Sequence, residues 1–291
     1  MHLRGDEWIN LVAFCWFLFL AWMPRRLALA RRIRITAIGA AGLAITLFAS
    51  LALPHLVPSR AAGIGRDWVP MLLLTLLYWQ AGQFVTGADR DFEQRLERLD
   101  LRLVAPALQW CARSPAGGWI FAYLELSYWS YFPLVPAAIA ALYLLGKPGL
   151  VDLLWTAILL GAYPSCGTLP FLPMRPPRAL GEKWTAGLPS GTMRAFNEWI
   201  LHRGSIQANT YPSVHVVIAT ACALVMLDTA PWWLGLAFCW VAVSIALGAV
   251  GGRYHYAADA ILGVLVGAAG FLAGIGLAAL GFLADSPRRG G

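Results

Sequence analysis

Long apolar runs, separated by short polar segments, dominate the hydrophobic pattern of this chain. A helix needs ~20 apolar residues to cross a hydrocarbon core of ~30 Å, and most of these runs approach that length. The pattern predicts eight membrane-spanning helices, at 8–24, 35–57, 68–86, 117–145, 150–172, 213–229, 231–250 and 257–283. Pro133 and Pro136 interrupt the fourth span, where we expect a kink or an offset. We therefore expect an all-α, polytopic membrane helix bundle.

The segment 89–110 has a different pattern, because its apolar residues recur at helical spacing among acidic and basic ones. These apolar residues are Phe92, Leu96, Leu99, Leu103 and Leu108. The spacing predicts one amphipathic helix lying in the membrane interface, and a solvated connector helix is the alternative. The predicted organisation is a two-span N-terminal addition (1–67), a membrane-embedded core (68–283) and a short tail (284–291).

Composition supports the membrane assignment. Of the 291 residues, 59% are hydrophobic and 13% are charged, whereas soluble domains carry about 25% charged residues. The net charge of +7 would also suit a nucleic-acid partner, but the basic residues lie in loops between spans, where orientation and anionic headgroups explain them. The five cysteines show no CxxC spacing and fall mostly in apolar runs, so we expect buried thiols and no disulfide framework.

Lysines and arginines are distributed unequally between alternate loops. The loops on one predicted side carry 16 of them, and the loops on the other side carry 6. The positive-inside rule places the richer side in the cytoplasm of a cell membrane. The same alternation puts the long 173–211 loop, His215 and His255 on this one side, as joint chemistry by these groups requires.

Two short motifs at the starts of the sixth and last spans contain histidines. They are Pro212-Ser213-Val214-His215 and His255-Tyr256-Ala257-Ala258-Asp259. Within the second motif, the i, i+4 spacing of His255 and Asp259 would place both side chains on one face of a helix. A lone histidine at a helix end is commonly a cap, and a metal site would require compact ligand spacings that these motifs lack. Two such motifs on one side of the membrane instead favour a catalytic site.

The long loop between the fifth and sixth spans supplies cations. It contains Pro176-Pro177-Arg178, in which the two prolines restrict the backbone just before the arginine. A guanidinium group matches phosphate oxygens bidentately, so we predict that Arg178 binds phosphate. For Arg194 and Arg203 of the same loop, we favour a role in membrane topology or in contacts with lipid headgroups, and a functional role is the alternative.

Glu125, Asp152 and Asp228 are three of the acidic residues that lie within or near predicted spans. Glu125 falls inside the fourth span, and an ionisable group at membrane depth is a candidate functional residue. It could line a substrate cleft, pair with an arginine of the long loop, or serve packing alone. Asp152 and Asp228 lie close to span ends, where we expect solvated carboxylates.

The three motifs together resemble those of the type-2 phosphatidic acid phosphatase superfamily, which also contains vanadium haloperoxidases and sphingolipid phosphotransferases. That family pattern is Lys/Arg-Pro, then Pro-Ser-x-His, then His-x-x-x-Asp, and its elements occur here in this order over roughly residues 68–283. The wording Pro-Pro-Arg and His-Tyr-x-x-Asp is most similar to the branch that contains inositol-phosphorylceramide synthases. Three positions depart from the pattern: Phe171 and Ala249 stand where cations are common, and Val214 stands where glycine is common.

The resemblance implies a six-helix phosphatase-type core and a role for each motif residue. His255 would be the nucleophile that forms a phosphohistidine, and Asp259 would hold its other ring nitrogen. His215 would protonate the leaving oxygen, while Arg178 and Ser213 would cradle the phosphate. The cations that could replace the missing ones are Arg175, Arg253 and Lys183. No metal or other cofactor is expected.

The predicted function is hydrolysis of a lipid phosphate ester by an integral membrane enzyme. The expected partners are the bilayer and the lipid phosphate, with no nucleic acid. One alternative is a lipid phosphotransferase similar to inositol-phosphorylceramide synthase, which would move a phospho-headgroup to a hydroxyl acceptor. An alternative from another class is a transporter or flippase of a phosphorylated lipid, although the internal repeat typical of many transporters is not visible. The headgroup and the oligomeric state do not follow from the sequence.

Overall fold

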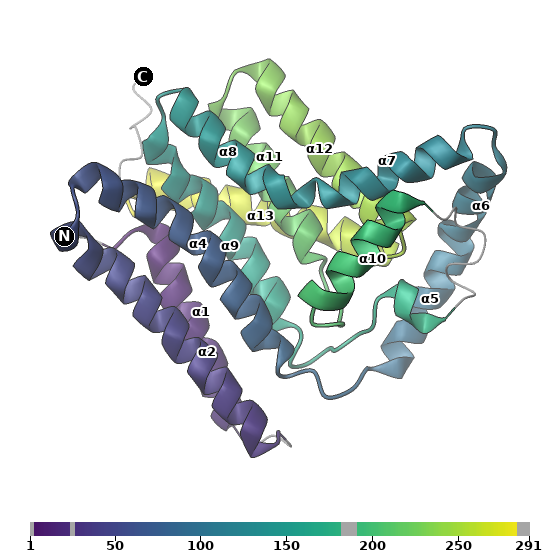
Figure 1. Ribbon diagram of the computed structural model, residues 1–291, viewed down its shortest axis with the longest axis horizontal. Helices are drawn as coiled ribbons and strands as arrows, with labels where there is room; N and C mark the ends of the chain where they lie inside the picture. The colour runs from purple at the N-terminus through teal and green to yellow at the C-terminus, as the bar shows by residue number, and fades with distance from the viewer. Residues whose placement is uncertain (1–2, 24–26, 182–190, 284–291) are drawn as a thin grey trace.

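The computed structural model describes residues 3–23, 27–181 and 191–283. These residues form helices joined by turns, and apart from one isolated β-bridge between Met174 and Asn209 they contain no strand. The all-α fold class predicted from the sequence is therefore confirmed (Figure 1). The predicted tail, 284–291, and Lys183 lie outside the described residues.

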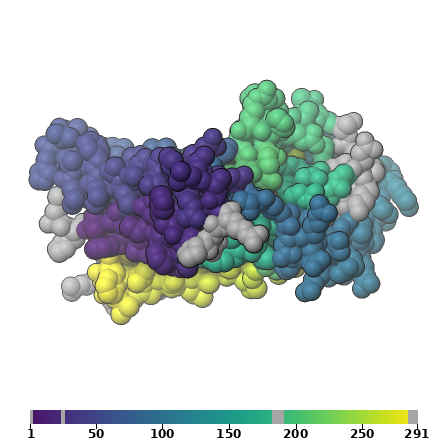
Figure 2. Space-filling view, turned by 90° about the horizontal axis from the view of Figure 1, so that it is seen from below, coloured from purple at the N-terminus to yellow at the C-terminus, as the bar shows by residue number. Residues whose placement is uncertain are grey.

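The N-terminal helices pack closely on the rest of the molecule. Helices α1 (Gly5–Trp22) and α2 (Leu29–Leu47) form a hairpin, and α2 continues through a π-helical turn into α3 (Leu53–Leu56). Helix α4 (Ser59–Gly82) then returns beside α2, so the expected boundary between residues 67 and 68 falls within α4. Figure 2 shows these helices over one half of the molecular face, with α5 and α6 on the other half.

The predicted amphipathic segment forms two helices, α5 (Arg90–Leu103) and α6 (Ala105–Arg113). Its apolar residues are divided between two faces, because Leu96 is buried whereas Leu99 and Leu103 are exposed. The inward face of α5 also carries the buried carboxylates Glu93 and Asp100. Each faces an arginine of another segment, so ion pairing as well as apolar packing orients this helix.

The fourth predicted span is broken where the prolines led us to expect distortion. Helix α7 (Gly117–Trp129) ends at Ser130, and α8 (Tyr131–Leu144) begins directly after it. Pro133 has no N–H to donate to the carbonyl of Trp129, and its ring crowds that carbonyl, which explains why the helix breaks there. The break brings Tyr128 and Tyr131 to the turn where the two helices meet.

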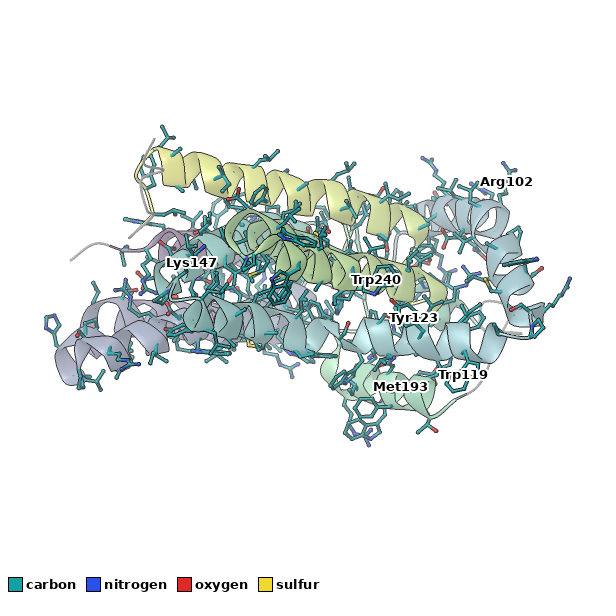
Figure 3. The ribbon with its side chains drawn as sticks, turned by 90° about the horizontal axis from the view of Figure 1, so that it is seen from above. Arg102, Trp119, Tyr123, Lys147, Met193 and Trp240 are labelled. Atoms are coloured by element: carbon teal, nitrogen blue, oxygen red, sulfur yellow. The ribbon has the colours of Figure 1, made fainter. Side chains whose placement is uncertain are left out.

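The core consists of α9 (Val151–Gly167), α11 (Val214–Thr229), α12 (Trp232–Gly251) and α13 (Ala257–Ala279). Helix α11 packs against the other three, and α10 (Thr192–Gly204) lies outside them against α7 (Figure 3). Close contact between α13 and α11 depends on Gly267, where an added Cβ would lie 2.6 Å from the carbonyl oxygen of Val217. Small residues that let backbones approach in this way are typical of membrane helix pairs.

Not every predicted span is a single long apolar helix. Four described segments are long and apolar enough to cross a membrane alone: Leu29–Leu56, Pro148–Gly167, Trp232–Gly251 and Ala257–Ala279. Helices α8 and α11 are apolar but shorter, at 14 and 16 residues, and α4 carries Arg66 and Asp67 within its length. Together the helices form an all-α membrane bundle.

Two expectations about individual residues were wrong. Asp152 is buried rather than solvated, because its carboxylate accepts the backbone N–H groups of Gly5 and Asp6 at the start of α1. Of the five free cysteines, Cys166 and Cys222 are buried as expected, but Cys15 is exposed. The outer face of a membrane helix is apolar too, so an apolar run alone does not distinguish a buried thiol from one facing lipid.

Candidate active site

The two motif histidines lie in contact, one at the start of α11 and the other in the turn just before α13. His255 belongs to the turn between α12 and α13, where the N–H groups of Tyr254 and His255 both donate to the carbonyl of Ala249. His215 is the second residue of α11. Its Nδ1 lies 3.4 Å from Nε2 of His255. The structure thus brings together two motifs that are forty residues apart.

Asp259 lies on the far side of the His255 ring. The two side chains are close together as the i, i+4 spacing predicted, but His255 precedes α13 and does not share a helix with Asp259. Its Oδ2 lies 3.3 Å from Nδ1 of His255 and accepts the backbone N–H of Tyr256 at 3.2 Å. The carboxylate is fully buried in the first turn of α13. It is therefore placed to fix the ring orientation and to favour the tautomer with its proton on Nδ1.

Asn209 contacts the same carboxylate and was missed from the sequence. Its Nδ2 donates to Oδ2 of Asp259 at 2.6 Å, and its backbone N–H donates to the carbonyl of Met174 at 2.7 Å. The side chain is 4% exposed. The available signal was its position three residues before Pro212, but a polar residue in a loop is too common to single out without a fold.

Arg178 and Ser213 are the predicted phosphate ligands that lie available near the histidines. Arg178 is in a 3-10 turn, its N–H donates to the carbonyl of Arg253, and its guanidinium lies 5.8 Å from the ring centre of Tyr254. Within the described residues, no carboxylate pairs with it. Ser213 is the N-cap residue of α11, and its buried Oγ makes no hydrogen bond to any residue that the structure describes.

Two of the other predicted cations are engaged by carboxylates of α5. Arg175 pairs with Glu93, with 2.8 Å between Nη2 and Oε2, and about half of its side chain is exposed. Arg253 is buried, and its Nη1 lies 3.8 Å from Oδ2 of Asp100. The sequence did not single out these two carboxylates, because acidic residues are expected on the polar face of an amphipathic helix.

Glu125 of α7 connects its own helix with α10 and with the turn between α12 and α13. It accepts hydrogen bonds from Arg194 and Asn197 of α10, at 3.1 and 2.7 Å, and from the hydroxyl of Tyr254. The expectation that Glu125 could pair with an arginine of the long loop is thus confirmed, with Arg194 as the partner. The ring of Tyr254 stacks on Tyr128 at 4.1 Å, so this cluster holds the His255 turn against α7.

Aromatic rings from α7 and α8 pack against His215. Tyr131 lies edge-on to its imidazole with 4.4 Å between ring centres, and Tyr128 lies 5.3 Å away. Both tyrosines come from the break between α7 and α8. The proline-induced break therefore shapes one wall of the candidate site.

The electrostatic environment keeps His255 neutral. Burial, and secondarily the positive charge of Arg178, lower the pKa of His255 to about 3. Its imidazole therefore carries no proton on Nε2 at neutral pH when Asp259 accepts from Nδ1. A neutral imidazole with a free lone pair beside a guanidinium can attack an electrophilic, anionic phosphorus centre. Among the described residues, no group of three or more histidine, cysteine or acidic side chains is placed to hold a metal ion.

Comparison with known proteins identified a family for this arrangement. A family model described as the PAP2 superfamily matches residues 94–273, which is more than half of the chain and includes all three motifs. The family expected from the motifs is therefore confirmed, whereas this match does not identify a branch within it. Neither the curated proteins nor the solved structures gave a match.

Proposed function

Because this chain belongs to the PAP2 superfamily of membrane phosphatases and phosphotransferases, we propose that it cleaves a phosphate ester of a membrane lipid through a phosphohistidine on His255. The observation that carries the proposal is the contact of His255 with both His215 and Asp259 beside an arginine that has no described carboxylate partner. Nucleophile, proton donor and phosphate ligand are the three groups that metal-independent phosphoryl transfer from an ester requires.

In the first proposed step, Nε2 of His255 attacks phosphorus and a nitrogen–phosphorus bond forms. The bond from phosphorus to the lipid oxygen breaks, and His215, which takes up a proton when the anionic phosphate group binds beside it, delivers that proton to the oxygen. Asp259 stabilises the positive charge that develops on His255. Arg178 and the Ser213 hydroxyl bind the phosphoryl oxygens, and the N-terminus of α11 adds favourable dipoles. His215, neutral after the first step, then takes a proton from water as the water oxygen attacks phosphorus. The nitrogen–phosphorus bond breaks, its electron pair returns to Nε2 of His255, and phosphate is released.

Phosphotransfer is the second candidate. The observation that supports it is that Arg175 and Arg253 pair with carboxylates of α5. A phosphate monoester carries a charge near −2 at neutral pH, since its second pKa is about 6. Arg175 and Arg253 are already paired with α5 carboxylates, and the positions Phe171 and Ala249 supply no charge. Few cations remain available among the described residues of the site, which suits a singly charged diester, whose phospho-headgroup would pass to an acceptor hydroxyl instead of water.

The deciding experiment measures both phosphate release and lipid products after purified protein is incubated with a panel of lipid phosphates without added metal. The panel contains phosphatidic acid, sphingosine phosphate, polyprenyl phosphate and a phospholipid diester supplied with a hydroxylated acceptor. We expect His255→Ala to abolish turnover and His202→Ala to retain it, because His202 is exposed on α10. Monoester hydrolysis would support the phosphatase, and acceptor-dependent turnover the transferase. Transport of the lipids without any turnover would contradict both.

A further inference from the structure

We infer that Asn209 is a positioning residue of the proposed reaction, which holds the Asp259 carboxylate and thereby fixes the tautomer of His255. This inference rests on the proposed function, since it assigns Asn209 a part in preparing the nucleophile. It concerns a residue outside the three motifs, in the loop segment that leads into α11.

The geometry around one carboxylate oxygen carries the inference. Oδ2 of Asp259 accepts from Nδ2 of Asn209 at 2.6 Å and from the backbone N–H of Tyr256 at 3.2 Å, and Nδ1 of His255 lies 3.3 Å away. The shortest of these contacts is the one from Asn209. Asn209 and Asp259 are both buried, so water does not compete for the oxygen.

The chemistry of an amide explains why asparagine suits this place. Its NH₂ group donates hydrogen bonds at every pH and cannot accept a proton from Asp259. The two donors Asn209 Nδ2 and Tyr256 N–H favour Oδ2 as an ionised acceptor against the cost of burying the carboxylate, and Nδ1 of His255 then supplies the proton between Asp259 and His255. The lone pair then remains on Nε2, the nitrogen that faces His215.

The backbone of Asn209 extends this role to the phosphate-binding loop. Its N–H donates to the carbonyl of Met174, four residues before Arg178, through the isolated β-bridge. One residue thus connects the loop that carries Arg178 with the helix that carries Asp259. Replacing the side chain alone leaves this backbone bond in place, so variants of Asn209 test the contact with the carboxylate.

Asn209→Asp tests the inference, because a purely structural role of Asn209 predicts no change in the shape of the pH profile of kcat. At low pH the two carboxyl groups can share a proton, and the protonated one donates as the amide did. As the pH rises both ionise and repel, so kcat should fall by roughly tenfold relative to wild type between about pH 5 and 8. Asn209→Ala should lower kcat at every pH with little change in KM. The assay uses the panel lipid that the wild type turns over fastest.

The matched control is Asn10→Asp, which changes another fully buried asparagine whose side chain contacts Tyr163 and the carbonyl of Asp6. It should lower stability without altering the shape of the pH profile. A profile of Asn209→Asp that runs parallel to wild type would overturn the inference.

A second measurement separates this inference from the proposed function. Nitrogen-15 NMR of the full-length protein with labelled histidine should show His255 in the Nδ1–H form, and a tautomer mixture in Asn209→Ala. An unchanged His255 signal in that variant would overturn the role of Asn209 even if the enzyme is active. If the wild type turns over no lipid, the proposed function fails, while the tautomer measurement still decides what Asn209 does.

Discussion

His255 illustrates how a single side chain combines burial with reactivity. The residue is 4% exposed, and its ring is surrounded by a carboxylate, a second imidazole and the positive charge of Arg178. Burial disfavours the imidazolium, so the folded protein keeps the form of histidine that is a nucleophile. The cost of this arrangement should be measurable as a loss of stability in acid.

We predict that the thermal stability of the detergent-solubilised protein decreases as the pH falls from about 6.5, the pKa of unfolded histidine, towards the folded pKa of His255 of about 3. In this window the unfolded chain binds a proton that the folded chain does not, so acid favours unfolding. His255→Gln should remove part of this decrease. His202→Gln, at an exposed position, should leave it unchanged. An identical slope for wild type and His255→Gln would contradict the assigned environment.

Arg178 should be sensitive even to a change that preserves its charge. Lysine cannot present the planar fork that binds two phosphoryl oxygens together. We expect Arg178→Lys to lower kcat/KM by roughly 10²-fold, comparable to the loss of one preorganised donor to a transition state. Arg203→Lys is the matched control, because Arg203 lies over the ring of Trp199 on α10. Equal effects of the two substitutions, measured with the same lipid, would refute the assignment.

At the scale of elements, α13 holds both the site and the bundle together. Its first turn carries Asp259, and its glycines lie against α11 and α9 further along. The distance between α13 and α11 therefore sets the distance between the Asp259 and Ser213 segments, which also meet through the N–H of Ser213 and the carbonyl of Asp259 at 3.1 Å. A change in packing far along the helix should reach the site through this contact.

Two glycines of α13 allow a matched test of this packing. A methyl group at Gly267 would lie 2.6 Å from the carbonyl oxygen of Val217, whereas one at Gly276 would meet no atom within 4 Å. We expect Gly267→Ala to destabilise the protein by about 1–3 kcal/mol, because backbone must move. Gly276→Ala should be neutral or stabilising by up to about 1 kcal/mol, since alanine is the better helix former. Unfolding in detergent compares the two, and equal stability would argue against close α11–α13 contact.

At the scale of the whole molecule, the N-terminal helices are fastened to the core by charge as well as by apolar packing. Arg66 of α4 donates two hydrogen bonds to the carboxylate of Glu7 in α1, both at 2.7 Å. Nη1 of Arg4 lies 2.6 Å from Oδ1 of Asp67. Trp155 of α9 donates to the carbonyl of Asp67. These contacts connect the predicted two-span addition with the part of the chain that carries the catalytic motifs.

Replacing one partner of the ion pair between Glu7 and Arg66 should lower the free energy of unfolding more than replacing both partners. Arg66→Leu leaves the buried carboxylate of Glu7 without its partner, a situation that typically costs about 3–5 kcal/mol. Adding Glu7→Leu to the same chain should recover most of that loss, because no unpaired charge remains. The two variants are compared by thermal unfolding. A double variant no more stable than Arg66→Leu alone would show that the pair has little part in holding the helices.

The sequence predicted the parts of the molecule that depend on local pattern. Long apolar runs located the helices, proline located the break at Ser130, and the spacing of His255 and Asp259 placed them together. Contacts between distant segments were not predictable in the same way. Glu93 and Asp100 of α5 meet arginines more than eighty residues later, and Asn209 meets Asp259 fifty residues later. Such pairings depend on tertiary packing, which leaves no periodic signal in the sequence.

The bridge between Met174 and Asn209 also affects how freely the intervening connection can change in length. The bridge joins the two ends of that connection next to the catalytic groups, so everything between them is a closed loop. Each doubling of the length of a flexible loop costs only about 0.6 kcal/mol of closure entropy. Insertions or deletions that leave Arg178 and α10 in place can therefore accumulate in this connection while the positions of the reacting atoms stay the same.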